Sequence, residues 1–217
     1  MRISKKILTI ILSIGLLVVI SCGDRPTGSG DVDNQINALF DSIPNPTGTP
    51  APDLTSATYT NKLTAKIEYV PQGEGESFPQ EIYLEITKDT VNNNKVTGGI
   101  TYKDESGNPQ KSPFFTDGIL SNDNNGKYFY RKVEEKVENF EGGKTLTSKH
   151  IHYIEFTKPT DGKITFTYIN ATSQKGDMPL DYDENYNPIG GFEYVNYGNK
   201  ITCSGDLIEE VQSGSGN

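Results

Sequence analysis

From residue 58 onward, apolar and polar side chains alternate with a period of two, the pattern of a half-buried β-strand. In "NKLTAKIEYV", the apolar residues Leu63, Ala65, Ile67 and Tyr69 alternate with lysine, threonine and glutamate. The stretches "EIYLEIT", "KVTGGITY" and "KITFTYIN" repeat this alternation. The pattern predicts about eight strands, and the last is long enough to be two. Their approximate ranges are 58–70, 81–88, 95–103, 113–121, 127–140, 145–158, 163–172 and 192–211.

Turn-forming residues separate the predicted strands. Asn125-Gly126 is the strongest of these signals, because a type I′ turn requires positive φ at both central residues. The short spacings predict antiparallel neighbours in a meander, without room for crossover helices. The stretch "RKVEEKVENF", residues 131–140, fits either a helix or a strand, and we favour a strand because turns flank it on both sides.

Strands with one apolar face must curl into a barrel or pack as two sheets. The long meander with tight turns favours an all-β fold, a single antiparallel meander closed as an up-and-down barrel, with a sandwich as the alternative. Such a barrel is loosely lipocalin-like. This comparison rests on architecture and implies no ligand. We expect one β domain over residues 58–211 and a disordered tail over 212–217.

A different pattern occupies the start of the chain. The uncharged run from Ile7 to Ile20 follows three basic residues, Arg2, Lys5 and Lys6. It is shorter than the roughly 20 residues that cross a bilayer as a helix. The pattern therefore predicts a cleaved secretory signal peptide over residues 1–21.

Residues 22–57 are rich in glycine and proline, which predicts a flexible tether. Within it, four apolar residues have helical spacing and predict a short helix over residues 31–43. These residues are Ile36, Leu39, Phe40 and Ile43. Asp31 or Asp33 is the expected cap. We favour docking of the helix on its own domain, with docking on a partner as the alternative.

The residues before Cys22 read "VISC", with the small residue Ser21 next to the cysteine. This stretch resembles the lipobox of bacterial lipoproteins in a relaxed form, and the resemblance covers residues 1–24 only. It implies cleavage after Ser21, acylation of Cys22 with fatty acids such as palmitate, and anchoring to a membrane of the bacterial cell envelope through the acyl chains. Gly23 slightly favours the outer membrane. An ordinary signal peptide followed by an incidental cysteine is the alternative.

Charge and cysteine content narrow the function further. Without residues 1–21 the chain has 17 basic and 29 acidic residues, a net charge of −12. A nucleic-acid-binding protein requires the opposite balance, so we expect no nucleic-acid partner. If Cys22 is acylated, Cys203 has no disulfide partner, and we expect it to be a small buried apolar residue.

Two short motifs resemble chemical sites. "GGKT" at 142–145 resembles the end of a phosphate-binding loop, but Glu138 replaces the first glycine, so we expect a hairpin turn. His150 and His152 would lie on one side of a strand, and two imidazoles at that spacing can share a metal ion. We favour two polar residues on a solvated strand face. We therefore expect no metal and no cofactor.

The stretch "DMPLDYDENYNPIGG", residues 177–191, is the longest irregular segment expected in the domain. Its alternating carboxylates lack the glycine and glutamate of a calcium loop. Long loops on β scaffolds often carry function, although a plain solvated loop is the favoured interpretation. Five residues form the candidate ligand or partner loop: Asp181, Tyr182, Asp183, Tyr186 and Tyr194.

The chain contains no recognisable activated nucleophile or placed acid–base pair, so we expect no catalysis. We expect a lipid-anchored envelope protein whose β domain binds a small ligand or an envelope or host protein. The alternative is a structural or assembly lipoprotein that docks on other envelope proteins, and a carboxylate-dependent hydrolase is a distant third. An enclosed apolar cavity would indicate a small-ligand binder, whereas a filled core with an exposed apolar patch would indicate protein docking.

Overall fold

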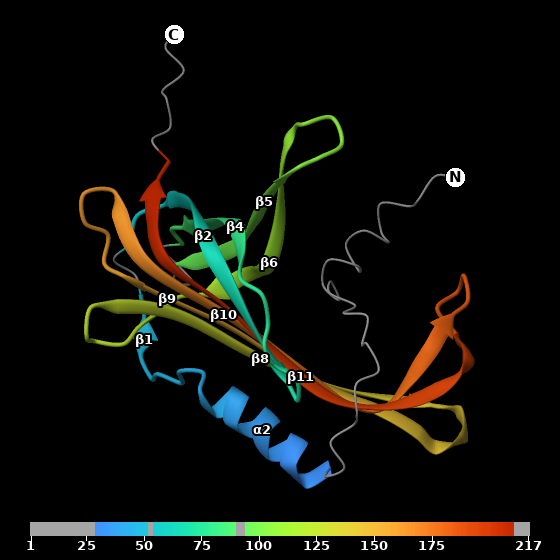
Figure 1. Ribbon diagram of the computed structural model, residues 1–217. Helices are drawn as coiled ribbons and strands as arrows, with labels where there is room; N and C mark the ends of the chain where they lie inside the picture. The colour runs from blue at the N-terminus through green and yellow to red at the C-terminus, as the bar shows by residue number, and fades with distance from the viewer. Residues whose placement is uncertain (1–28, 52–53, 90–93, 211–217) are drawn as a thin grey trace.

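The computed structural model describes residues 29–51, 54–89 and 94–210, which form one antiparallel sheet and one long helix (Figure 1). The predicted signal peptide, Cys22 and the predicted tail lie outside these residues. The helix is α2 (Ser29–Asp41). The long strands are β2 (Ala57–Val70), β4 (Phe78–Thr87), β5 (Lys95–Lys103), β6 (Pro109–Ile119), β8 (Lys127–Phe140), β9 (Lys144–Thr157), β10 (Lys163–Tyr182) and β11 (Pro188–Glu209). Two-residue strands β1 (Thr49–Pro50), β3 (Gly73–Glu74) and β7 (Ser121–Asn122) complete the sheet.

The sheet nearly closes into a barrel, as the sequence predicts. Its hydrogen-bonded order is β1-β7-β8-β9-β10-β11-β2-β4-β5-β6, with β3 added to β2. The first long strand, β2, therefore pairs with the last, β11, and joins the two ends of the meander; Ile67, for example, lies opposite Ile201. The ring stays open between β6 and β8. The barrel prediction is confirmed, and so is the strand prediction for residues 131–140.

Aromatic rings fill the gap between β6 and β8. The register of β5 and β6 shifts at Phe114, a β-bulge that lets Phe114 and its neighbour Phe115 both face the interior. Both rings stack on Tyr168, and Phe115 also stacks on Tyr130 of β8 at 5.0 Å between centroids. A Cβ at Gly98 would lie 2.6 Å from the Phe115 ring, so this position requires glycine. Side-chain packing thus closes the ring where backbone pairing does not.

Two separate cores stabilise the fold. The inner core fills the barrel with side chains from all eight long strands, and several members, such as Leu84 and Ile154, have no exposed surface. The outer core lies between α2 and the opposite face of the sheet. Its helical members are Val32, Ile36, Leu39 and Phe40, followed by Ile43, and its strand members are Phe129, Ile151, Tyr153, Ile169 and Ala171.

The predicted helix is present and docks on its own domain. It begins two residues earlier than expected, so Asp31 and Asp33 lie inside its first turns. Asp33 bonds the sheet instead: its carboxylate accepts from Lys175 Nζ at 2.7 Å and from Asn196 Nδ2 at 3.0 Å. Lys200 Nζ donates to Ser42 Oγ at 3.0 Å. The helix is therefore held by an apolar stripe with polar contacts beside it.

The expected tether over 22–57 differs from the structure in its described part. Helix α2 packs on the sheet, and Ala51 and Leu54 are buried in the inner core. The backbone N–H of Ala51 donates to Leu120 O, and β1 pairs with β7. The glycine and proline content predicted a flexible tether, but a few apolar residues among the prolines suffice to dock an extended segment on the domain.

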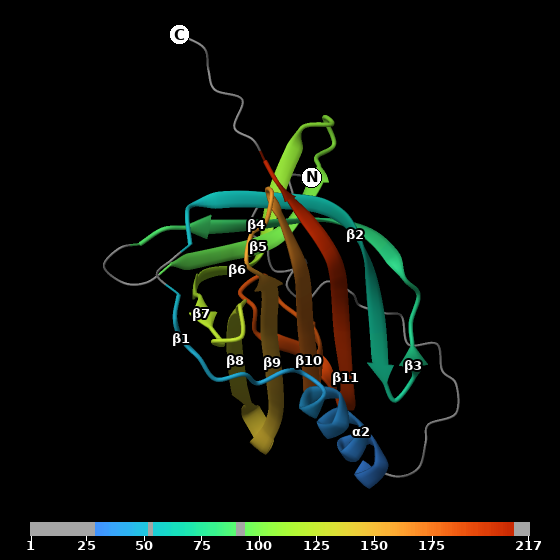
Figure 2. The ribbon, with the colours of Figure 1, turned by 90° about the vertical axis from the view of Figure 1, so that its left-hand side faces the viewer.

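Strands β8 to β11 continue beyond the barrel as an arm, which we define as residues 132–149 and 172–198 (Figure 1). We call the face that continues the barrel interior the concave face, and the face that carries α2 the convex face. The irregular segment expected at 177–191 is mostly a strand hairpin, because β10 and β11 stay paired as far as Tyr182 and Pro188. Helix α2 lies beneath β10 and β11 when the molecule is viewed from the barrel end, opposite the arm (Figure 2).

Candidate functional site

Polar side chains replace the apolar ones where the concave face leaves the barrel. On β10, the inner-core residues end at Tyr168, and Asn170, Thr172 and Gln174 follow on the same face. Residues directly opposite in an antiparallel pair share a face. The half-buried polar residues opposite them on β9 and β11 complete the set, which we call the concave polar row: His150, His152, Asn170, Thr172, Gln174, Tyr197 and Asn199.

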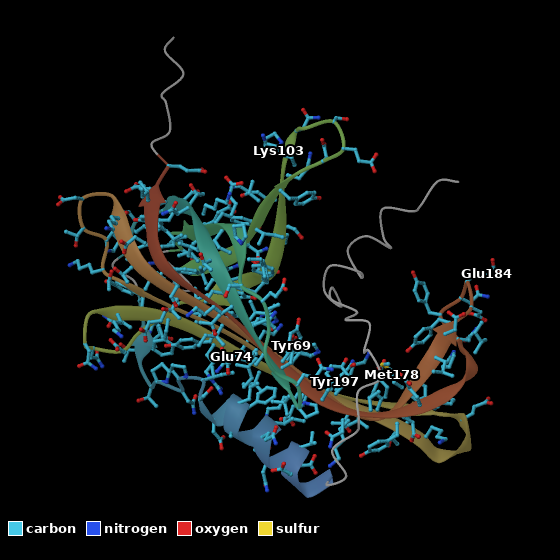
Figure 3. All side chains as sticks on the ribbon, in the orientation of Figure 1. Tyr69, Glu74, Lys103, Met178, Glu184 and Tyr197 are labelled. Carbon is cyan, nitrogen blue, oxygen red and sulfur yellow. The ribbon has the colours of Figure 1, made fainter. Side chains whose placement is uncertain are left out.

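Members of the row bond to one another across the strands. Thr172 Oγ1 lies 3.2 Å from His150 Nδ1, and the Tyr197 hydroxyl donates to Gln174 Oε1. All seven side chains are half-buried. Figure 3 shows Tyr197 on the concave side of the sheet, between Tyr69 nearer the barrel and Met178 further along the arm. The row is thus an ordered polar surface.

Three polar atoms at the barrel end of this row lack a hydrogen-bond partner among the described residues. They are His152 Nδ1, the Tyr168 hydroxyl and Asn170 Oδ1, and all three are buried. Asn170 lies opposite His152, and Tyr168 is two residues before Asn170 on the same face. A buried polar group without a partner costs about 1–3 kcal/mol. A cluster of three such atoms therefore marks a place where a hydrogen-bonding ligand would relieve that cost.

Burial sets the charge of this cluster. It lowers the pKa of His152, and the neighbouring His150 lowers it further, while Glu134 acts in the opposite direction. Burial also lowers the pKa of His150. Burial raises the pKa of Tyr168. The nearby Asn170 amide offsets part of that rise, although the two groups do not form a hydrogen bond of good geometry. At neutral pH the cluster is therefore uncharged.

Aromatic rings form the floor next to the cluster. The Phe114 ring stacks on Tyr168 at 4.9 Å, and the Phe115 ring lies 6.4 Å from the His152 ring. On the outer side, Lys132 and Glu134 of β8 lie opposite the two histidines and form an ion pair of 2.6 Å. The site thus combines an apolar floor, neutral polar groups and a charged rim.

Hollows elsewhere are shallow. In the described part of the chain, two hollows have volumes of about 390 Å³ and 410 Å³, and both are open to solvent. The first lies beside the turn between β9 and β10, and the second lies between α2 and the β2–β3 turn. Neither is an enclosed apolar cavity, and the barrel interior is filled by the inner core.

The five loop residues singled out from the sequence are not gathered into one site. Asp183 holds the hairpin turn, since its carboxylate accepts from the N–H groups of Asn185 and Asn187. Asp181 accepts from the N–H of Tyr182 at 2.8 Å. Tyr182 and Tyr186 are exposed at the tip, whereas Tyr194 lies opposite Asp177, further down the arm. Their role in binding stays a prediction.

The structure also places the "GGKT" motif, Cys203 and the two histidines. "GGKT" includes the turn between β8 and β9, with positive φ at Gly142 and Gly143, so the hairpin prediction is confirmed. Cys203 is buried in the inner core, as expected, and burial raises its pKa to about 11. The histidines lie half-buried on the concave face, not on a solvated strand face. Among the described residues, no group of three or more metal-ligating side chains is present.

The sequence patterns do not identify Tyr168 and Asn170 as binding-site residues. The signal was present in "KITFTYIN", because Asn170 occupies the position at which the alternation expects another inward-facing apolar residue. A polar residue at such a position is informative when it is buried. The bulge that turns Phe114 and Phe115 inward has no comparable signal.

Comparison with known proteins shows no significant similarity to a protein-family model, a curated protein or a solved structure. Within the described ranges, no helix is both long enough and apolar enough to cross a membrane.

Proposed function

We propose that this protein is a lipid-anchored protein of the bacterial cell envelope whose β domain binds an uncharged, hydroxyl-bearing ligand, such as a saccharide, on its concave face. The unpartnered cluster of His152, Tyr168 and Asn170 carries the proposal. A site built to hydrogen-bond a hydroxyl group favours that group strongly, because its own buried polar atoms are otherwise unpaired.

The chemistry of the cluster defines the ligand class. Hydroxyl groups both donate and accept, and so do a neutral imidazole, a phenol and an amide. The Phe114 and Phe115 rings offer apolar contact beside these groups. A strongly charged ligand would find no opposite charge within the cluster, which is neutral at pH 7. A neutral polyol therefore fits the site better than an anion or a cation.

The lipid anchor rests on the sequence around Cys22. Six residues lie between Cys22 and the start of α2 at Ser29, so the seven steps between these two residues span at most about 25 Å. An acylated Cys22 would hold the arm and helix close to the bilayer surface. Metabolic labelling with a fatty acid tests this part: label should enter the natural chain and be lost in Cys22→Ser. Label that persists in Cys22→Ser would contradict the anchor.

Binding is tested on an array of neutral oligosaccharides with the full chain and two matched variants. Asn170→Leu removes the amide of the cluster while keeping a similar volume, and should lower affinity at least about tenfold. Asn61→Leu changes an asparagine on β2, outside the cluster, and should leave affinity unchanged. Equal binding by all three chains, or no binding by the natural chain, would overturn the concave-face proposal.

The hydrolase alternative gains no support from the carboxyl groups. General acid catalysis needs a carboxyl whose pKa is raised. In the described part of the chain, every carboxyl with a clear shift has a lowered pKa, because amide N–H groups or lysines bond to it. These residues are Asp33, Asp104, Asp123, Glu134, Asp177, Asp183 and Asp206.

Protein docking is a second candidate, favoured by the distribution of exposed apolar side chains. Seven of the ten large exposed ones among the described residues belong to the arm: Val133, Val137, Leu180, Tyr182, Tyr186, Ile189 and Tyr194. Exposed aromatic and aliphatic residues gathered on one projection are typical of a protein-contact surface.

A further inference from the structure

The outer strand of the arm, β8, has a long edge without a strand partner among the described residues. On one side β8 pairs with β9 over its whole length, without a register shift. On the other side, β7 pairs only with Tyr128 and Phe129. We call residues 131–139 the free edge of β8. Figure 2 shows β8 at the outside of the row β8-β9-β10-β11, with α2 under the other end of that row.

The backbone of this edge is oriented for pairing. The N–H and C=O of Lys127 both bond to Asp123, on the β7 side, so Lys127 points its backbone groups away from β9. Alternate residues of a strand point their backbone groups the same way. Residues 131, 133, 135, 137 and 139 therefore present their N–H and C=O groups to the outside. An unpaired edge of this kind is a template for another strand.

We propose that two copies of this protein dimerise through the free edges of their β8 strands, which pair antiparallel with Glu135 opposite Glu135. This register is symmetric, as a two-fold dimer requires. Each outward-pointing residue of one copy then lies opposite an outward-pointing residue of the other. All the hydrogen bonds of a regular antiparallel ladder form along the edge.

The side chains support this register. Lys132 of one copy lies opposite Glu138 of the other, and Glu134 lies opposite Lys136. Val133 lies opposite Val137, and their exposed fractions, 43% and 58%, fall as the two copies pair. Opposite charges and apolar pairs directly across two strands both stabilise a sheet. The sequence of the edge is therefore complementary to itself.

Other registers are disfavoured. A shift of one residue places outward-pointing backbone groups opposite inward-pointing ones and loses the hydrogen bonds. A shift of two residues in one direction places Lys132 opposite Lys136 and Glu134 opposite Glu134. The same shift in the other direction places Glu134 opposite Glu138 and Lys136 opposite Lys136. Like charges directly opposite destabilise the pair, so the charge pattern disfavours both shifts of two residues.

The one like-charge contact in this register has a local counter-charge. Glu135 faces its own copy across the two-fold axis. In each copy, Lys149 of β9 lies 3.0 Å from the Glu135 carboxylate. The two lysines thus neutralise the two glutamates at the centre of the interface. The resulting sheet joins the concave faces of both copies into one surface.

Disulfide cross-linking of the full chain, purified in detergent and mildly oxidised, tests the register. Glu135→Cys should give a two-chain band, because directly opposite Cα atoms lie about 5.5 Å apart, within disulfide range. Val137→Cys alone is the matched control: its two copies would lie about 13 Å apart along the strand. Val133→Cys combined with Val137→Cys should cross-link again. The unchanged chain sets the background from Cys22 and Cys203.

A charge exchange tests the interface without oxidation. Lys132→Glu should weaken dimerisation about tenfold, because it turns two attractive contacts into repulsive ones. Adding Glu138→Lys should restore the dimer, although within one chain it places like charges side by side at 132 and 134 and at 136 and 138. Sedimentation of the full chain in detergent measures both. Circular dichroism checks that each variant is folded.

Cross-linking and sedimentation together decide whether the β8 dimer forms. Cross-linking by Glu135→Cys but not by Val137→Cys, together with rescue by the double charge exchange, supports the dimer. Equal cross-linking by both single cysteines, a monomeric natural chain, or a double variant weaker than Lys132→Glu overturns it. None of these measurements depends on the saccharide proposal, so the two can fail separately.

Discussion

Four of the eight long strands of the barrel continue into the arm, but only in the barrel do apolar cores cover both faces of these strands. In the barrel, the inner core covers one face of β9 and β10 and α2 covers the other; Ile154 and Ile151, for example, are both buried. In the arm, the concave face carries part of the concave polar row, and Val137 and Tyr194 are exposed. Backbone pairing nevertheless continues through both regions.

This contrast separates two sources of strand stability. Apolar burial stabilises the barrel, since each buried large side chain contributes about 1.5–3 kcal/mol relative to an exposed one. The arm depends on its hydrogen-bonded ladder, on ion pairs such as that between Lys144 and Asp177, and on continuity with the barrel. The region with less burial is freer to carry binding surfaces, because fewer of its side chains are committed to the core.

The largest expected difference between the regions comes from leucine truncation. Leu84→Ala in the inner core should lower the free energy of unfolding by about 2–5 kcal/mol, because Leu84 has no exposed surface and truncation leaves a cavity. Leu180→Ala in the arm should change it by less than about 0.5 kcal/mol, because Leu180 is 56% exposed. Urea unfolding measures both. Similar losses at the two sites would contradict the contrast.

The outer core lies at the boundary of the two regions. Leu39→Ala on α2 should lower the free energy of unfolding by about 2 kcal/mol and increase amide exchange in the helix. Gln35→Ala, on the exposed side of the same helix, is the control and should have little effect. If Leu39→Ala leaves exchange in residues 29–41 unchanged, the helix is not held by this core.

The two histidines lie where the barrel meets the arm, and they make the stability of this junction depend on pH. Burial lowers the pKa of His150 and His152 below 6.5, so the unfolded chain takes up protons first as pH falls. Stability is therefore full above 6.5 and declines as pH drops through the lowered pKa values. Urea midpoints between about pH 7 and pH 5 measure this, above the range where carboxyl groups titrate. His152→Gln should flatten the profile, and an unchanged slope would exclude His152 as its cause.

The smallest effect is expected at the tip of the arm. Asp183→Ala removes the acceptor that holds the N–H groups of Asn185 and Asn187, so amide exchange should rise in residues 182–188. The midpoint of global unfolding should not move. Glu184→Ala is the matched control, since its carboxylate lies at the same tip (Figure 3). A global loss of stability in Asp183→Ala would show that the tip is coupled to the barrel.

Much of the barrel could be predicted from the alternation of side chains. Strands β5 and β8 have the predicted ends, and β2 and β9 differ by one residue. The predicted strand over 163–172 is ten residues shorter than β10. Beyond Tyr168 the concave side of β10 carries polar residues, so the alternation of apolar and polar side chains disappears there. The strand persists there through backbone pairing with β9 and β11, which leaves little trace in side-chain pattern.

The candidate site was harder to predict. His150 and His152 attracted attention as a pair of rare residues, but their partners Tyr168 and Asn170 come from another strand. Their meeting depends on the register between β9 and β10, and the floor depends on the bulge in β6. The exposed tyrosines of the tip were predicted from their residue type alone, and residue type does not show whether side chains form one binding surface.

The sequence by itself determined the strand periodicity, the meander, the amphipathic helix and the self-complementary charges of β8, because each depends on residues close together in the chain. Tertiary structure alone decided that α2 covers the convex face, that Ala51 and Leu54 enter the inner core, and that three polar atoms without a hydrogen-bond partner among the described residues lie at the mouth of the barrel. Those features depend on which strands become neighbours and in what register, and side chains far apart in the chain carry no local record of that choice.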